Sequence, residues 1–224
     1  MQFAMEPDHK YNRVRLLYSV SDSYHGLERW NENTYPLLFV MGLSGAGKTT
    51  ICTALSVQYK CPYISLDALR FYDSASPESR QAVDEFLLLY PHIAASVTTH
   101  WARQDFFHSN ERAYAKYTRL FIAFLRDRAA QEQQRYIVEG IQLFVRQPKE
   151  TLLNQPKIIL GTGGLKCFYR ATKRTYPKMH FRFFPDLIRR FFRYYVIQLI
   201  RLNYYIDFWE RKEFTFQITR TDSQ

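Results

Sequence analysis

Residues 42 to 49 read Gly42-Leu43-Ser44-Gly45-Ala46-Gly47-Lys48-Thr49, and this stretch predicts the fold. It has the spacing G-x-x-x-x-G-K-[ST] of a phosphate-binding loop. Its glycines let the backbone curl so that successive N–H groups point at a phosphate, and a helix starting near Lys48 adds the positive end of its dipole. In such loops the lysine reaches the β- and γ-phosphates and the hydroxyl of Thr49 ligates Mg²⁺.

We therefore expect this loop to bind the phosphates of ATP or GTP together with Mg²⁺. The expected phosphate-binding residues are Gly42, Ser44, Gly45, Ala46, Gly47, Lys48, Thr49 and Thr50. With glycine at about 7% of residues, a random chain of this length would match the pattern roughly once in a hundred times. The match also lies between an apolar run at residues 37–41 and a helix-compatible segment at residues 49–59, which is the context that the motif requires.

Short apolar runs alternate with helical patterns along the rest of the chain. Further strands are expected at residues 63–66, 135–140 and 157–160, and helices at about 76–90 and 110–134. Such alternation favours an α/β fold with a doubly wound parallel sheet and helices on both faces. The expected architecture is of the phosphate-binding-loop (P-loop) NTPase type, with a helical lid. We expect an N-terminal extension at residues 1–36, which packs on one domain at residues 37–224.

Charge and cysteine content narrow the class of protein. The 224 residues carry a net charge of +10, and from residue 166 onward 13 Lys and Arg oppose 5 Asp and Glu. A positive C-terminal end indicates an anionic partner, which charge alone leaves open between a phosphorylated substrate, nucleic acid and an anionic membrane surface. The three scattered cysteines are typical of reduced thiols, and residues 1–10 contain no apolar signal-like run. These features predict a cytoplasmic protein.

Three observations favour a kinase over other nucleotide-binding proteins. The sequence contains no N-K-x-D for base recognition by a switch GTPase. No apolar strand ends in the Asp-Glu pair of a motor ATPase, because the pair Asp84-Glu85 lies in a predicted helix. An acid and an arginine, Asp67 and Arg70, instead follow the second predicted strand.

Residues 42–50, followed by Ile64-Ser65-Leu66-Asp67-Ala68-Leu69-Arg70, resemble the P-loop small-molecule kinases, especially zeta toxins and adenylylsulfate kinases. Residues 136–141, Tyr-Ile-Val-Glu-Gly-Ile, are similar to the third strand of uridine kinases and zeta toxins. The resemblance implies that Asp67 is the catalytic carboxylate, that Arg70 binds an anionic part of the substrate, and that Glu139 lies near Mg²⁺ and the acceptor. Zeta toxins usually carry His-Pro soon after the arginine, where this chain has Phe71-Tyr72-Asp73, so the likeness does not extend to a nucleotide-sugar acceptor.

The chemistry of these residues supports the same roles independently of the resemblance. A carboxylate at the tip of a parallel strand faces the ligand crevice and can take the proton of an attacking hydroxyl, which suits Asp67. The alternative for Asp67 is to cap the next helix. Glu139 ends a buried strand, where an unpaired carboxylate is costly, so we expect it to meet substrate or, through water, a metal that Thr49 also binds. Arg70 is equally consistent with an exposed helix arginine.

Basic residues follow the fourth predicted strand at helical spacing. Lys166, Arg170, Lys173 and Arg174 fall on one side of a helix. We expect a lid at about residues 161–180, with Arg170 and Arg174 as catalytic arginines that meet the charge on the γ-phosphate together with Lys48, which we also expect to be catalytic. The alternative is a solvated basic face. A further basic, aromatic helix is expected at about residues 185–211, either packed on the sheet or bound to nucleic acid or membrane.

These observations lead to one expected function and two alternatives. The expected function is an ATP-dependent kinase that transfers the γ-phosphoryl group to a hydroxyl of a small molecule, such as a nucleoside, a nucleotide or a sugar-like acceptor. One alternative is a nucleotide-dependent binding protein whose basic C-terminal region holds nucleic acid or membrane. The other is a kinase that acts on nucleic-acid ends.

Overall fold

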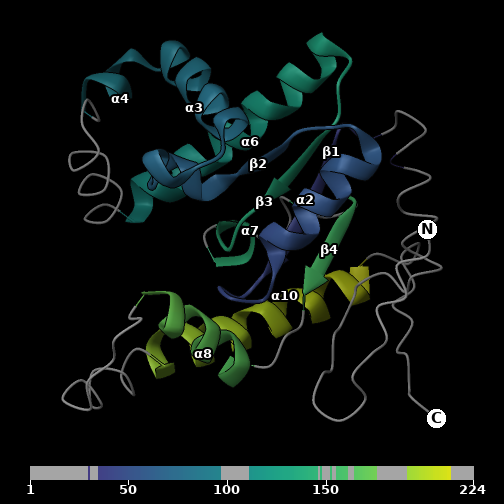
Figure 1. Cartoon of the computed structure of the whole chain (residues 1–224), viewed down its shortest axis with the longest axis vertical. Helices are drawn as coiled ribbons and strands as arrows, with labels where there is room; N and C mark the ends of the chain where they lie inside the picture. Colours follow the sequence, from purple (N-terminus) through teal and green to yellow (C-terminus); the bar gives the residue numbers. More distant parts are fainter. Residues whose placement is uncertain are drawn as a thin grey trace.

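The computed structural model describes residues 30, 35–96, 111–145, 147, 152, 155–160, 164–175 and 191–212. These residues form an α/β fold around a parallel sheet of four strands (Figure 1). The strands are β1 (Leu37–Gly42), β2 (Tyr63–Ser65), β3 (Tyr136–Glu139) and β4 (Lys157–Leu160). Their order in the sheet is β2-β3-β1-β4.

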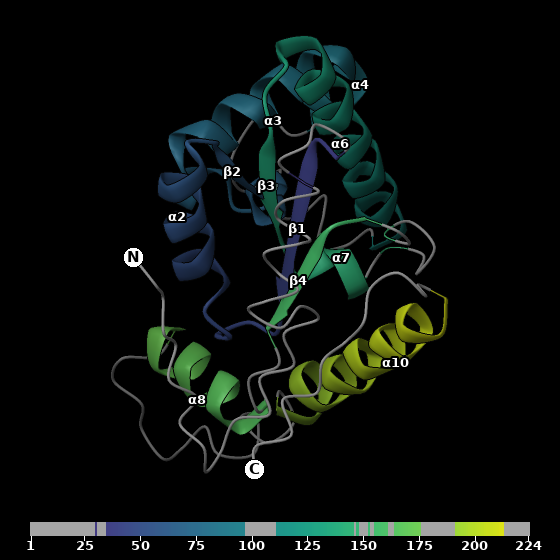
Figure 2. The ribbon, with the colours of Figure 1, turned by 90° about the vertical axis from the view of Figure 1, so that its right-hand side faces the viewer.

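The sheet is buried on both faces, as its nearly continuous apolar strands predict. Every residue of β1, β3 and β4 is buried. Parallel neighbours need crossover connections. Helix α2 (Lys48–Tyr59) connects β1 to β2, and α3 (Pro77–Leu89), α4 (Pro91–Ser96) and α6 (Glu111–Glu132) lie between β2 and β3 in the sequence. Figure 2 shows α2 on one side of the sheet and α6 on the other.

The two longest connecting helices form for reasons visible in their sequences. In α3, Ser76 is the N-cap and accepts a hydrogen bond from the Ser79 amide, and Pro77 takes the first helical position. In α6, an apolar stripe at helical spacing packs into the core, with Tyr117, Phe121 and Leu125 buried. Both helices were expected from these signals, and both are confirmed.

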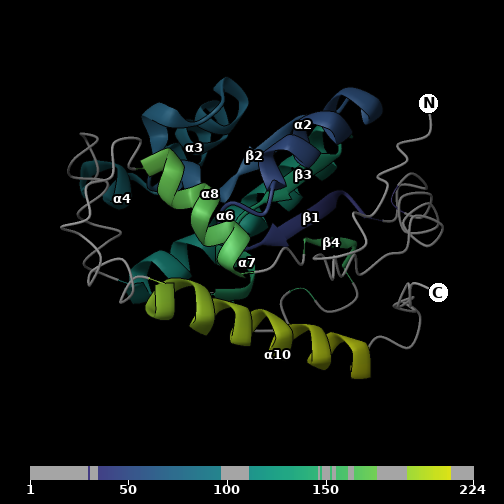
Figure 3. The ribbon, with the colours of Figure 1, turned by 60° about the horizontal axis from the view of Figure 1, so that its bottom comes forward.

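The C-terminal part of the chain adds helices at one end of the sheet. A short helix α7 (Gln142–Val145) follows β3, and α8 (Gly164–Thr175) follows β4. A six-residue π-helical turn η5 (Phe191–Val196) then continues into α10 (Ile197–Lys212). Phe168 of α8 packs edge-on against Phe191 and Tyr195 of η5. Figure 3 shows α10 on the side of the sheet away from α2.

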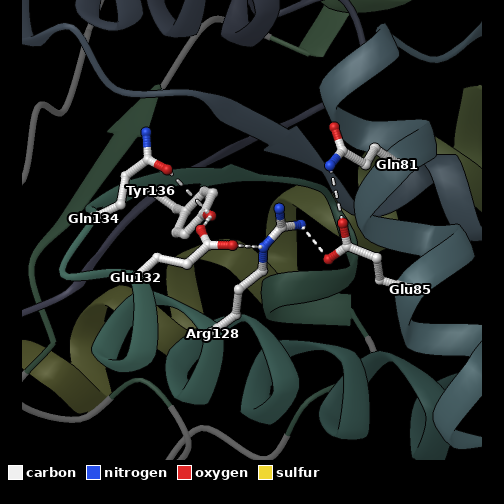
Figure 4. A network of polar contacts seen from close by, with 6 residues as sticks. All are labelled: Gln81, Glu85, Arg128, Glu132, Gln134 and Tyr136. Carbon is white, nitrogen blue, oxygen red and sulfur yellow. Dashed lines mark hydrogen bonds and ion pairs between the residues drawn. The ribbon is translucent and has the colours of Figure 1, made fainter.

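A polar network joins α3, α6 and β3 at the amino-terminal end of the sheet (Figure 4). Arg128 of α6 forms an ion pair with Glu85 of α3 at 2.9 Å and another with Glu132 at 2.9 Å. The hydroxyl of Tyr136, the first residue of β3, donates to Glu132. Parallel strands all point the same way, so this network lies at the end of β3 opposite to Glu139.

Within the expected N-terminal extension, Trp30 packs on the described fold. Trp30 is fully buried, lies edge-on to Tyr59 and is covered by the guanidinium of Arg135 at 4.8 Å. Arg135 also donates to the Trp30 carbonyl at 3.1 Å. Residues 1–29 and 31–34 lie outside the described residues.

Several expectations need correction at their boundaries. The second strand ends at Ser65, because Leu66 already begins the 3₁₀ turn η1 (Leu66–Leu69). Helical spacing puts Phe192 on the apolar face of the helix expected at about residues 185–211, but that side chain is 58% exposed. The glycine-rich run at residues 161–164 would suit a hinge for the expected lid, and Gly164 is the first residue of α8. Residues 161–163 and 185–190 lie outside the described residues, as do residues 214–219, whose alternating apolar pattern predicts a final strand.

Cys52, Cys61 and Cys167 are buried thiols that form no disulfide. Within the described ranges, every helix is too short or too polar to cross a lipid bilayer.

Candidate functional site

The carboxyl ends of three neighbouring strands bring the expected site residues together. The glycine-rich loop follows β1, Glu139 is the last residue of β3, and Asp67 lies in η1, directly after β2. Because β3 lies between β1 and β2, Glu139 is flanked by both neighbours and pairs in register with Val40 and Ser65. Residues far apart in the sequence thus meet at the carboxyl end of the sheet, where ligands of open parallel sheets bind.

The loop has a backbone path that its glycines make possible. Gly45 and Gly47 have φ of 83° and 97°, in the left-handed region, and Gly47 is the N-cap of α2. A Cβ on Gly45 would lie 2.5 Å from the carbonyl oxygen of Cys167, whereas one on Gly47 would meet no atom within 4 Å. The first N–H groups of α2 have no partner within the helix and point toward the loop, as an anion site requires.

Lys48 lies folded along the loop. Its Nζ donates to the carbonyl oxygens of Gly42 at 3.0 Å and Leu43 at 3.1 Å. Burial lowers the pKa of Lys48, and the nearby carboxylates of Glu139 and Asp67 act in the opposite direction. The ammonium group is therefore held at the start of the loop, between the backbone and two acids, where added negative charge from a phosphate would stabilise it.

Thr49 and Glu139 form a pair suited to a hard cation. The Thr49 hydroxyl lies 3.4 Å and 3.5 Å from the two carboxylate oxygens of Glu139. The pKa of Glu139 is raised, because burial outweighs the opposing effects of Lys48 and of hydrogen bonds from Ser65 and Thr49. A divalent cation here would relieve the cost of the buried charge, so these residues fit Mg²⁺ chemically.

The protein supplies only part of a complete metal shell at this position. Among the residues that the structure describes, no group of three His, Cys, Asp or Glu side chains could hold a metal ion. Mg²⁺ commonly takes one or two protein ligands and completes its shell with phosphate oxygens and water. The Thr49 and Glu139 pair agrees with that pattern.

Asp67 does not cap the following turn, which removes the alternative role considered for it. The N-cap of η1 is Ser65, and Asp67 lies inside the turn. Its side-chain Oδ1 instead accepts a hydrogen bond from Nε2 of Gln142. Arg70, the C-cap of η1, places its guanidinium 5.0 Å from the ring centre of Phe71 and is half-buried, so it differs from an exposed helix arginine.

Helix α8 lies against the glycine-rich loop. The backbone of Cys167 packs on Gly45, and Nη1 of Arg170 lies 3.4 Å from the Gly45 carbonyl oxygen. Arg170 is thus the expected arginine that the structure brings to the loop. The side chains of Lys166 and Arg174 lie outside the described residues. Of the remaining loop residues, Ser44 and Thr50 are exposed and Ala46 is buried.

Sequence reasoning missed two side chains that contact candidate site residues, and a third side chain, Tyr114, that anchors one of them. Gln142, the first residue of α7, donates to Asp67 and also to the Tyr114 hydroxyl at 2.8 Å. Ser65 donates its hydroxyl to Glu139. One signal was present for Gln142, because a polar residue three positions past the end of a buried strand lies at the ligand edge of a parallel sheet. Tyr114 gave no such signal, since it belongs to an apolar helix stripe.

The comparisons with known proteins give no relative from which a role could be carried over. The chain matches no protein-family model and no curated protein. The interpretation of the site therefore depends on its own residues.

Proposed function

We propose that this chain is a P-loop phosphotransferase that moves the γ-phosphoryl group of Mg-ATP, or of Mg-GTP, to a hydroxyl of a small molecule. The fold class that this implies is the doubly wound P-loop NTPase type, of which the four-stranded parallel sheet would be the core. The proposed activity is that of the P-loop small-molecule kinases that the sequence resembles.

The loop and Lys48 support the nucleotide part of this proposal. Backbone N–H groups from the loop and from the start of α2 would hold the β- and γ-phosphates. Nζ of Lys48 would exchange a carbonyl contact for a phosphate oxygen, since it lies at the mouth of the loop. Bound Mg²⁺ would neutralise charge on the transferred group, held by the Thr49 hydroxyl and by Glu139, directly or through water.

Asp67 supports the transfer part. Asp67 follows the carboxyl end of β2, and β2 is the direct neighbour of β3, which ends at Glu139. In the proposed reaction its carboxylate accepts the proton of the acceptor hydroxyl as the oxygen attacks phosphorus. Arg70 would bind an anionic group of the acceptor, and Arg170 would stabilise the charge that develops on the γ-phosphoryl group.

One contact in the structure gives the strongest support to the proposal. The Thr49 hydroxyl of the glycine-rich loop lies within 3.5 Å of the carboxylate of Glu139, from a strand 90 residues later in the chain. Motif matching alone does not require this contact. It arises because β3 is the direct neighbour of β1, and it joins a predicted metal ligand to a buried acid.

A transfer assay tests the proposal. The full chain, Mg²⁺ and γ-labelled ATP are incubated with a panel of nucleosides, nucleotides and sugars, and labelled products are separated from free phosphate. We expect one class of hydroxyl compound to acquire label. Release of free phosphate alone, with every panel member unlabelled, would contradict the kinase.

Asp67→Asn separates binding from transfer in the same assay. We expect this variant to retain Mg-ATP affinity within about twofold and to lose roughly a hundredfold or more in transfer rate, because a general base contributes about 10²–10⁴ to rate. Unchanged turnover would remove Asp67 from the mechanism. Asp73→Asn, at an exposed acid in the next turn, is the matched control.

A second candidate function is supported by the exposed face of α8. Tyr169 is 65% exposed, and Arg170 and Lys173 beside it are also exposed. An exposed aromatic side chain beside cations suits stacking and phosphate contacts with a nucleic-acid strand. Binding of a labelled oligonucleotide that weakens steeply as salt rises, and that Tyr169→Ala abolishes, would favour a nucleic-acid-end kinase or a nucleotide-dependent binding protein.

A further inference from the structure

A buried glutamine connects the proposed base to the core of the protein. Gln142 is 3% exposed and begins α7, three residues after Glu139. Its Nε2 donates one hydrogen bond to Oδ1 of Asp67 and another to the hydroxyl of Tyr114 on α6. Both amide hydrogens are thus used, and they join η1, α7 and α6.

The other end of the same amide argues against a purely structural role. Oε1 of Gln142 is buried and has no hydrogen-bond partner among the described residues. An unsatisfied buried polar atom costs about 1–3 kcal/mol, and an apolar side chain of similar size would avoid this cost. What the amide provides in return is the fixed donor toward Asp67.

The chain is also shaped to let this amide reach Asp67. Gly140 lies between β3 and α7, and a Cβ there would be 2.4 Å from Oε1 of Gln142 and 3.0 Å from Cβ of Leu66. The first contact would force the glutamine amide to move, and the second is tighter than most Cβ contacts in proteins. Glycine at position 140 therefore makes room for the glutamine amide beside the turn that carries Asp67.

We propose that Gln142 is a positioning residue for Asp67, an inference that rests on the proposed kinase function. By holding Oδ1, the amide fixes the rotation of the carboxylate and leaves Oδ2 to face the acceptor. In the transfer step the acceptor O–H bond breaks and its proton goes to Oδ2 of Asp67. The acceptor oxygen forms the new O–P bond, and the nucleoside diphosphate leaves with the electrons of the broken P–O bond.

Gln142→Met tests this role, because methionine has a similar volume and no donor. With the acceptor that wild type labels fastest, we expect kcat to fall about tenfold to a hundredfold, as expected when a reacting group is misplaced. The Kd for Mg-ATP, measured by calorimetry, should stay within twofold, because the amide hydrogen bonds of Gln142 go to Asp67 and Tyr114 rather than to the glycine-rich loop.

Gln147→Met is the matched control. Gln147 is also a 3% exposed glutamine with an unpaired Oε1, and its Nε2 reaches the backbone of Ala115 on α6 at 3.5 Å rather than Asp67. We expect its kcat to remain near that of wild type. If both glutamine variants lose activity equally, or if neither does while wild type transfers phosphate, the positioning role is wrong and the kinase proposal stands.

Two further measurements cover the remaining outcomes. Should Gln142→Met fail to fold, Tyr114→Phe removes the anchor of the amide, and an unchanged kcat in that variant would overturn the inference. In ¹⁵N spectra, the side-chain amide signal of Gln142 should move on Asp67→Asn and not on Gln147→Met. A wild type that binds Mg-ATP but labels no acceptor overturns the proposed function, and this inference with it.

Discussion

Gly45 and Gly47 both have positive φ, but only Gly45 is packed against a neighbouring segment. Substitutions at the two positions therefore separate the cost of backbone strain from the cost of a steric clash. An L side chain at such positive φ costs about 1–2 kcal/mol. Gly45→Ala would add a clash with the Cys167 carbonyl of α8, whereas Gly47→Ala would enter open space. We therefore expect Gly45→Ala to lower the free energy of unfolding in urea by more than Gly47→Ala does. Equal losses would show that α8 does not pack on the loop as described.

Glu139 and Glu132 are carboxylates whose pKa values shift in opposite directions. Burial raises the pKa of Glu139. The free energy of unfolding therefore falls as pH rises from the ordinary pKa of 4.5 through the raised folded pKa, because the buried carboxylate becomes charged. A hydrogen bond from Tyr136 lowers the pKa of Glu132, so its contribution is present above 4.5 and is lost as pH falls through the lowered folded pKa.

The substitutions Glu139→Gln and Glu132→Gln should therefore change the stability of the fold in opposite directions. At pH 7 without nucleotide, we expect Glu139→Gln to raise the melting temperature and Glu132→Gln to reduce it. Addition of Mg-ATP should stabilise wild type and Glu132→Gln, and should stabilise Glu139→Gln much less. Thermal melts from pH 4 to pH 8 check both statements, and a lower melting temperature for nucleotide-free Glu139→Gln would contradict the account of its burial.

At the scale of elements, α8 presents two exposed cations with different positions relative to the loop. Arg170 lies 3.4 Å from the Gly45 carbonyl, whereas the structure records no bond from Lys173 to the loop. We expect Arg170→Ala to lower the kcat of transfer by about tenfold or more, as losing a donor at developing charge does, with Lys173→Ala within twofold of wild type. Equal effects of the two substitutions would indicate a general basic face instead.

The elements with strong local signals were the ones that the sequence predicted. The apolar runs of β1, β3 and β4, the Ser76-Pro77 start of α3 and the aromatic stripe of α6 each form where expected. Element ends were less predictable, because Leu66 fits a buried strand by composition but turns into η1. The π-helical turn at η5 also has no distinct residue pattern.

At the scale of the whole molecule, site residues differ in how far they could be predicted. The loop was predicted from its motif, and Asp67 and Glu139 from their places at strand ends, because parallel strands place their carboxyl ends at one edge. The contacts of Gln142 with Asp67 and Tyr114 span 75 and 28 residues of chain. No local pattern encodes such pairs, since they depend on strand order and on how α6 and α7 pack on the sheet.

The central claim is that the loop at residues 42–49 binds the phosphates of a nucleotide through Lys48. A calorimetric titration of the full chain with Mg-ATP, beside the same titration of Lys48→Ala, tests it most directly. We expect wild type to bind with one site per chain and Lys48→Ala to bind at least about tenfold more weakly, which corresponds to a loss of about 1.4 kcal/mol. No measurable binding by folded wild type, or equal affinity in the two proteins, would contradict the account.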